Sequence, residues 1–109
     1  MEREVQDIAQ IDRLIHEPAR LAIVAVLSAC ESADFKALLT LTGLSKGNLS
    51  ANLQKLEEAG YLQIQKSFKG RYPHTNCALT AQGRQAFQQY WQRYQALGAA
   101  LNRQHQPSE

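Results

Sequence analysis

The sequence is poor in cysteine and has no long apolar run, and these two absences exclude several classes of protein. The only cysteines, Cys30 and Cys77, lie far apart and form no Cys-x-x-Cys motif. We therefore expect buried thiols rather than a disulfide framework or a zinc site. No apolar stretch approaches the ~18 residues of a membrane-spanning helix, and the N-terminal residues, charged with both signs, lack the pattern of a secretory signal. These features predict a cytoplasmic protein with no membrane partner.

Motifs for catalysis are also missing. The three histidines, His16, His74 and His105, are scattered, with no carboxylate or cysteine at ligand spacing, which disfavours metal binding and acid–base catalysis. The sequence contains neither a Gly-x-Ser-x-Gly nucleophile motif nor a glycine-rich phosphate loop. We expect a protein that is not an enzyme and that has no cofactor and no metal.

Positive charge is present, and it gathers in the middle of the chain. With 109 residues the chain fits one domain over residues 1–109. Residues 1–34 include seven acidic and three basic side chains, whereas residues 35–71 include six basic and two acidic ones. This distribution says more about a nucleic-acid partner than the net charge of +2 does.

Apolar spacing predicts two helices in the first thirty residues. Ile8, Ile11 and Ile15 recur at intervals of three and four, which indicates a short helix over 5–15. An almost continuous apolar run, 21–27, follows Pro18, and proline suits the first turn of a helix. The β-branched residues of this run also fit a strand, but its length and its alanine and leucine residues favour a buried helix.

The next segment has the features of a helix-turn-helix. Asp34 and Ser45 are good N-caps for helices over 35–41 and 46–59, and Gly60 fits the end of the second helix. Two short helices joined by a tight turn that contains glycine are typical of this motif. The second helix has one apolar face, formed by Leu49, Leu53 and Leu56.

Alternating residues after Gly60 predict a β-hairpin, and a heptad pattern then predicts a long helix. Apolar and polar side chains alternate over 61–68, a return strand is expected over 75–79, and residues 69–74 would form the tip. Thr80 can cap a helix over 81–103, and the polar tail after it is expected to fray. The helix has apolar residues at intervals of three and four: Phe87, Tyr90, Tyr94, Leu97 and Leu101.

The stretch GLSKGNLSANLQKLEEAGYL, residues 43–62, resembles the recognition helix and first wing strand of small winged-helix transcriptional regulators related to the MarR and ArsR groups. The resemblance extends from about Ile15 to Tyr94 and includes HEPARLAIVAVL and LTAQGRQAF. It implies a mainly α fold with a small β-hairpin: a winged helix-turn-helix with a long C-terminal dimerisation helix, which binds double-stranded DNA as a homodimer.

The sequence departs from the family in two respects. Metal-sensing relatives have a cysteine pair on the helix before the turn, where this chain has DFKALLTLT, so we expect no metal site there. The larger MarR-type chains have more helix around a ligand crevice, so a small-molecule effector is unsupported by this short sequence.

The outer face of the 46–59 helix is the candidate surface for base contacts. With the three leucines turned inward, the opposite face is polar and small, which allows close approach to base edges and offers hydrogen-bonding groups. An ordinary solvated helix face would have the same composition, so the neighbouring turn and hairpin decide in favour of DNA. The candidate residues are Ser45, Lys46, Gly47, Asn48, Ser50, Ala51, Gln54 and Lys55.

The hairpin tip is the candidate wing. Lys66, Lys69 and Arg71 can meet phosphates or enter a minor groove, and Tyr72 can add a hydrogen bond to phosphate. Lysines on a hairpin can also serve only to prevent aggregation, but no acidic residue lies between Lys66 and His74, which favours DNA. Arg20 could be a further phosphate contact, but we favour a structural role with Glu57 and Glu58 as partners.

The helices at the two ends of the chain predict a dimer. Their apolar residues extend beyond what a three-helix core can cover, and a second copy is the simplest partner. A ligand-binding use of the aromatic stripe is less common than a core or interface use. The expected interface, formed by helices 5–15 and 81–103, consists of Ile8, Ile11, Ile15, Phe87, Tyr90, Trp91, Tyr94, Leu97 and Leu101.

The sequence thus predicts a homodimeric transcriptional repressor that binds a pseudo-palindromic operator through successive major grooves. The alternative is a protein-interaction module that keeps the winged-helix scaffold without specific DNA binding, because a fold does not fix a function.

Overall fold

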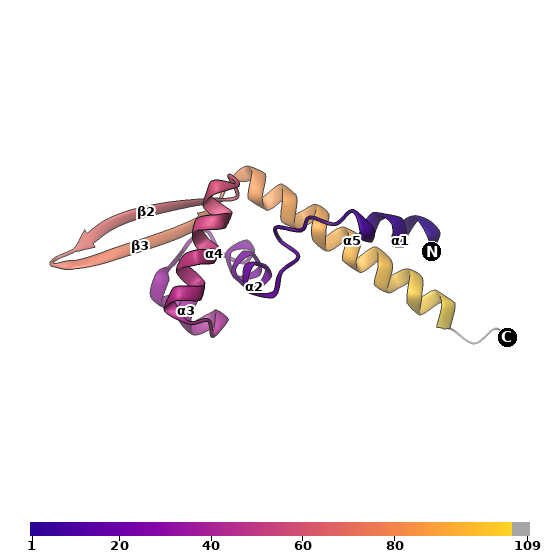
Figure 1. Ribbon diagram of the computed structural model, residues 1–109, viewed down its shortest axis with the longest axis horizontal. Coiled ribbons are helices and arrows are strands. Elements are labelled where there is room, and N and C mark those ends of the chain that lie inside the picture. The colour runs from indigo at the N-terminus through magenta and orange to yellow at the C-terminus, as the bar shows by residue number, and fades with distance from the viewer. Residues whose placement is uncertain (106–109) are drawn as a thin grey trace.

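The chain folds into a central helical core with a hairpin at one end and a long helix at the other (Figure 1). The computed structural model describes residues 1–105, and the principal extents of the chain are 67 × 24 × 23 Å. The predicted class, mainly helical with a small hairpin, is confirmed. The elements are α1 (Glu2–Ala9), α2 (Pro18–Ser28), β1 (Ala33–Asp34), α3 (Phe35–Thr42), α4 (Lys46–Glu58), β2 (Leu62–Lys69), β3 (Tyr72–Leu79) and α5 (Ala81–His105).

The core lies among α2, α3, α4 and the base of the hairpin. The apolar run over 21–27 is the buried helix α2, as predicted, with Pro18 as its first residue. Its N-cap is Glu17, whose carboxylate accepts hydrogen bonds from the backbone amides of Ala19 and Arg20 at 3.2 and 2.9 Å. The side chains with no exposed surface include Ile23, Val24, Leu27, Leu38, Leu49, Leu56 and Cys77.

The predicted helix-turn-helix is formed by α3 and α4, and its caps are those expected from the sequence. The carboxylate of Asp34 accepts a hydrogen bond from the amide of Ala37 at 2.7 Å, and the hydroxyl of Ser45 accepts one from the amide of Asn48 at 3.1 Å. Gly43, which follows α3, has a φ of 69°, a left-handed conformation that favours glycine. These local interactions fix where both helices begin and where α3 ends.

The predicted helix over 5–15 is wrong, because α1 spans only Glu2–Ala9. After it the carboxylate of Asp12 accepts hydrogen bonds from the amides of Leu14 and Ile15, at 2.9 and 3.2 Å. This local bonding competes with the helical pattern and turns the chain. Ile15 then points into the protein and has no exposed surface, so its apolar spacing reflects burial rather than a helix.

The sheet contains one strand more than predicted, and the hairpin is longer. The strand order is β1-β3-β2, and both pairs are antiparallel. The two-residue β1 has no recognisable sequence pattern. The return strand begins at Tyr72 instead of residue 75, so the loop shrinks to Gly70 and Arg71. Pro73 pairs with Phe68 where β1 no longer flanks β3, and proline is tolerated at such a free edge.

The last helix, α5, starts against the end of α4. Thr80 accepts a hydrogen bond from the amide of Gly83 at 3.0 Å and donates one to the carbonyl of Gly60 at 2.6 Å. The helix covers the predicted range 81–103 and continues through His105. The remaining tail residues, 106–109, which were expected to fray, lie outside the described residues. No helix within residues 1–105 has the length and apolarity required to span a bilayer.

Gly83 provides a test of this junction. A Cβ built on Gly83 would lie 2.2 Å from the carbonyl oxygen of Tyr61, whereas one on Gly47 meets nothing within 4 Å. Both glycines lie in the first turn of a helix. Gly83→Ala should therefore lower the free energy of unfolding by about 2 kcal/mol or more, and Gly47→Ala, the matched control, should leave it unchanged or raise it by up to ~1 kcal/mol. Urea denaturation followed by circular dichroism measures both. Equal stabilities would contradict the close approach at Gly83.

Candidate nucleic-acid interface

The outer face of α4 is exposed along its whole length. Leu49, Leu53 and Leu56 are buried, at 0%, 3% and 0% exposure, and hold the opposite face against the core. Gly47 has open space around it, so no packing within the chain requires a glycine there. All eight residues predicted for base or phosphate contact are exposed in the free chain: Ser45, Lys46, Gly47, Asn48, Ser50, Ala51, Gln54 and Lys55.

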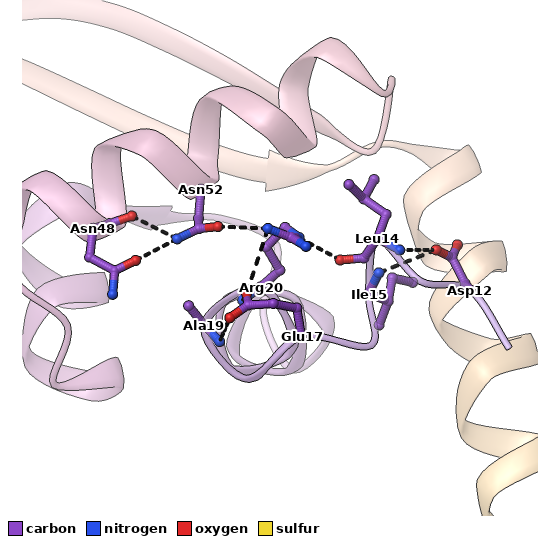
Figure 2. A network of polar contacts seen from close by, with 8 residues as sticks. All are labelled: Asp12, Leu14, Ile15, Glu17, Ala19, Arg20, Asn48 and Asn52. Atoms are coloured by element: carbon purple, nitrogen blue, oxygen red, sulfur yellow. Dashed lines mark hydrogen bonds and ion pairs between the residues drawn. The ribbon is translucent and has the colours of Figure 1, made fainter.

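A polar network that the sequence did not reveal connects α4 with α2 (Figure 2). Asn52, only 7% exposed, lies on the inner face of α4 between leucines. Its carbonyl accepts a hydrogen bond from Nη1 of Arg20 at 3.0 Å, and its amide donates to the backbone carbonyl of Asn48 at 2.9 Å and to the Oδ1 of Asn48. A buried polar group needs such partners, and the only sequence signal was an asparagine at an apolar position.

Arg20 has the structural role that we predicted, but with different partners. Its Nε donates to the carbonyl of Leu14 at 2.6 Å, and its Nη1 lies 3.7 Å from the carboxylate of Glu17. The expected partners, Glu57 and Glu58, make neither a hydrogen bond nor an ion pair with it. The backbone amide of Arg20 donates to Glu17 and thereby lowers the pKa of that carboxyl, with a further contribution from the Arg20 charge.

The loop before α2 is fixed to the far end of α4 through Tyr61. The Tyr61 hydroxyl donates a hydrogen bond to Oδ2 of Asp12. Burial, together with this hydrogen bond, raises the pKa of the Tyr61 hydroxyl to about 12. This hydrogen bond links the loop before α2 to the segment that follows α4.

The wing is exposed from its middle to its tip. Gly70 has a φ of 65° and forms the two-residue loop with Arg71. The predicted contact residues Lys66, Lys69, Arg71 and Tyr72 are all exposed, and Tyr72 is 78% exposed. Phe68, one of the apolar residues of the alternating pattern, is 74% exposed, because the distal hairpin extends beyond the core (Figure 1).

A groove of about 530 Å³ lies between α4 and the wing. Ser50 and Gln54 line it from α4, and Lys66 and Thr75 line it from the hairpin. Phe35 is also among its lining residues. The groove therefore brings together Ser50 and Gln54 of the predicted recognition face and Lys66 of the predicted wing; Glu57 also lines it, whereas Lys69, Arg71 and Tyr72 are not among its lining residues.

The surface predicted for dimerisation is partly exposed. α1 lies beside α5, linked by an ion pair of 3.6 Å between Glu4 and Arg103 and by a hydrogen bond from Arg93 to the carbonyl of Gln10. Ile8, Ile11 and Leu97 are half-buried within the chain. The side chains of Trp91, Tyr94 and Leu101 are 49%, 46% and 41% exposed.

Two residues of the predicted interface belong to the interior of the chain instead, and a third packs against the core. Ile15 and Tyr90 are 0% and 2% exposed, so almost none of their surface is available for contact with a partner subunit. The Tyr90 hydroxyl and Nδ1 of His16 share a hydrogen bond of 2.9 Å. Burial raises the pKa of the Tyr90 hydroxyl. Phe87 is half-buried and packs against the core. These corrections leave a narrower apolar stripe on α5.

The two cysteines differ in burial. Cys77 is fully buried, as expected, whereas Cys30 is only half-buried. Burial raises the pKa of the Cys77 thiol to about 11. Within residues 1–105 no three His, Cys, Asp or Glu side chains gather as metal ligands would.

Comparison with protein families and curated proteins gives two matches. The family model described as a winged helix DNA-binding domain matches residues 19–97, which include α2 to α4, both wing strands and most of α5. An uncharacterized protein of Methanocaldococcus jannaschii is 37% identical over 79 residues, which are 72% of this chain and 85% of that protein.

Solved structures share the fold. A transcriptional regulator homologue from Pyrococcus horikoshii superposes with a TM-score of 0.82 at 26% identity and covers 93% of this chain and 98% of its own. A MarR-family transcriptional regulator from Silicibacter pomeroyi has a TM-score of 0.65 at 20% identity, over 98% of this chain and 72% of its own. At that lower identity the second likeness concerns the fold alone.

Proposed function

We propose that this chain, which belongs to the winged helix DNA-binding domain family, is a MarR-like cytoplasmic repressor that binds a pseudo-palindromic operator as a homodimer. The observation that supports this most is the concave surface where the polar outer face of α4 meets the basic hairpin. In this proposal the whole chain acts as one non-enzymatic DNA-binding domain, without a metal or cofactor.

The outer face of α4 is suited to a major groove. Gly47 and Ala51 present almost no side chain, so the helix backbone can come close to base edges, while Ser50 and Gln54 offer donors and acceptors to them. Lys46 and Lys55 can neutralise phosphates beside the groove. In helix-turn-helix proteins the first residues of the second helix make such base contacts, and Ser45 caps this end of α4.

Gly47 separates DNA contact from folding. Gly47→Ala adds a methyl group into open space, so stability should be maintained, but the methyl group would stand between the helix and the base edges. We expect at least a tenfold loss of affinity for the operator, which is on the order of 1–3 kcal/mol. Fluorescence polarisation with a DNA duplex from the region upstream of the gene measures this affinity. Unchanged affinity would show that α4 does not approach DNA closely at this point.

The wing would contact the phosphate backbone. Each phosphate contact releases counterions and contributes about 0.9 to the slope of log affinity against log salt concentration. If Lys69 and Arg71 each contact one phosphate, Lys69→Ala with Arg71→Ala should reduce that slope by about 3.6 for a dimer with two wings.

The matched control is Arg13→Ala, which removes an exposed basic side chain from the loop between α1 and α2 and should leave the slope unchanged. A wild-type slope in the double variant would show that the wing is not a DNA contact. A wild-type protein that binds no duplex at all would favour the protein-interaction module instead.

The dimer is supported by the apolar stripe that remains exposed on α5. Trp91→Glu with Leu101→Glu places two charges on this stripe without disturbing the core, because neither side chain is buried. We expect sedimentation at micromolar concentration to change from dimer to folded monomer, with a large loss of operator affinity, because two half-sites are no longer bound together. The control Gln88→Glu changes an exposed side chain of the same helix and should remain dimeric. A monomeric wild type would rule the dimer out.

A further inference from the structure

A chain of hydrogen bonds that starts at Arg20 fixes the orientation of the Asn48 side chain. A guanidinium group can only donate hydrogen bonds. The Asn52 atom that lies 3.0 Å from Nη1 of Arg20 must therefore be the oxygen Oδ1. Arg20 is itself held by the carbonyl of Leu14 and the carboxylate of Glu17, so this end of the chain of hydrogen bonds is anchored within the protein.

The nitrogen of the Asn52 side-chain amide determines which atom of the Asn48 side chain faces inward. With Oδ1 on Arg20, the nitrogen Nδ2 of Asn52 faces Asn48, where it donates to the backbone carbonyl and to a side-chain atom. A backbone carbonyl only accepts, which agrees with this orientation. The side-chain atom of Asn48 that receives a hydrogen bond from Asn52 must likewise be an acceptor, Oδ1.

Within the described residues 1–105, the nitrogen of the Asn48 side-chain amide consequently has no hydrogen-bond partner. Asn48 is exposed, and Figure 2 shows its Nδ2 pointing away from Asn52. Gln54, the other amide on this face, differs, because within residues 1–105 its side chain hydrogen-bonds with Glu58 at the surface of the same helix and with no buried group. Of the two amides, only Asn48 is oriented by buried groups.

We infer that Asn48 presents a hydrogen-bond donor to the DNA, and that Arg20 is a positioning residue for base preference although it does not touch the DNA. The inference rests on the proposed function. A donor selects bases with acceptors in the major groove, above all guanine with N7 and O6, and disfavours cytosine, which offers the donor N4. A bidentate pair with adenine would need Oδ1 of Asn48 as well, and Asn52 already engages that oxygen.

The test is Asn52→Asp, which reverses the polarity of the network. A carboxylate at this position keeps an acceptor on Arg20 and places a second acceptor towards Asn48. The Asn48 amide should then turn so that its Nδ2 donates inward and its Oδ1 faces the DNA. An outward acceptor favours the N4 amino group of cytosine.

The base preference is measured with a set of operator duplexes that differ at one base pair each. Asn48→Ala identifies the position that Asn48 contacts, because the preference there disappears. At that position we expect the wild type to favour guanine over cytosine about tenfold, and Asn52→Asp to reverse the order, while preferences elsewhere stay as in the wild type. Arg20→Met removes one of the two groups that orient the Asn52 amide, the other being the backbone carbonyl of Asn48, and should weaken the preference without reversing it.

The outcomes separate this inference from the proposed function. A wild type with no base preference at any position contradicts the proposed function. A wild type whose preference at the Asn48 position is for cytosine, or an Asn52→Asp variant that keeps the wild-type order, overturns the inference alone.

If Asn52→Asp does not fold, the orientation of the Asn48 amide is tested instead by NMR, from hydrogen exchange of side-chain amides in the free wild-type protein. The side-chain amide protons of Asn52 should exchange at least tenfold more slowly than those of Asn48, because only the former are hydrogen-bonded. Equal exchange rates overturn the inference.

Discussion

The arrangement of the helices depends on one buried amide. Asn52 lies on the inner face of α4 among leucines, and an unpaired amide there would cost on the order of 1–3 kcal/mol. Arg20 satisfies its carbonyl and is in turn fixed by Leu14 and Glu17. Leucine packing holds the inner face of α4 against the core, and these directional bonds add a preference for one rotation of α4 relative to α2. The outer face of α4 is therefore set by a contact on its inner face.

A second fixed point lies at the opposite end of α4. Tyr61 donates its hydroxyl to Asp12, and its backbone carbonyl accepts a hydrogen bond from the amide of Thr80 at 3.0 Å. The same carbonyl lies so close to Gly83 that only glycine fits there. One residue thus joins the N-terminal loop, the first wing strand and the start of α5. The wing and the long helix diverge from this point in fixed directions (Figure 1).

Local chemistry explains which parts of this structure the sequence could predict. Asp34, Ser45 and Gly43 act on their own neighbours in the chain, so the ends of α3 and the start of α4 were predictable. Asp12 also acts locally, on the amides of Leu14 and Ile15, and this turn was missed because the apolar spacing was followed instead. The pairs Asp12–Tyr61 and Asn52–Arg20 join residues distant in sequence, and no spacing rule indicates such pairs. The spacing of Ile15 and Tyr90 predicted that they belong to an apolar stripe on the surface, but both are buried within the chain. Spacing identifies a face, but only the fold shows whether the chain itself already covers that face.

The two sides of the proposed DNA surface differ in how they are held, and this difference bears on how each would act. Buried groups orient α4, so under this proposal its contacts with bases would be set before binding and could discriminate between them. The distal wing is held only by pairing between β2 and β3, since Phe68 and Tyr72 extend beyond the core. A hairpin without core packing can adjust to the backbone of any duplex, which suits sequence-independent phosphate contacts. A rigid base-contacting helix beside an adjustable basic wing would therefore assign specificity to α4 and salt-dependent affinity to the hairpin.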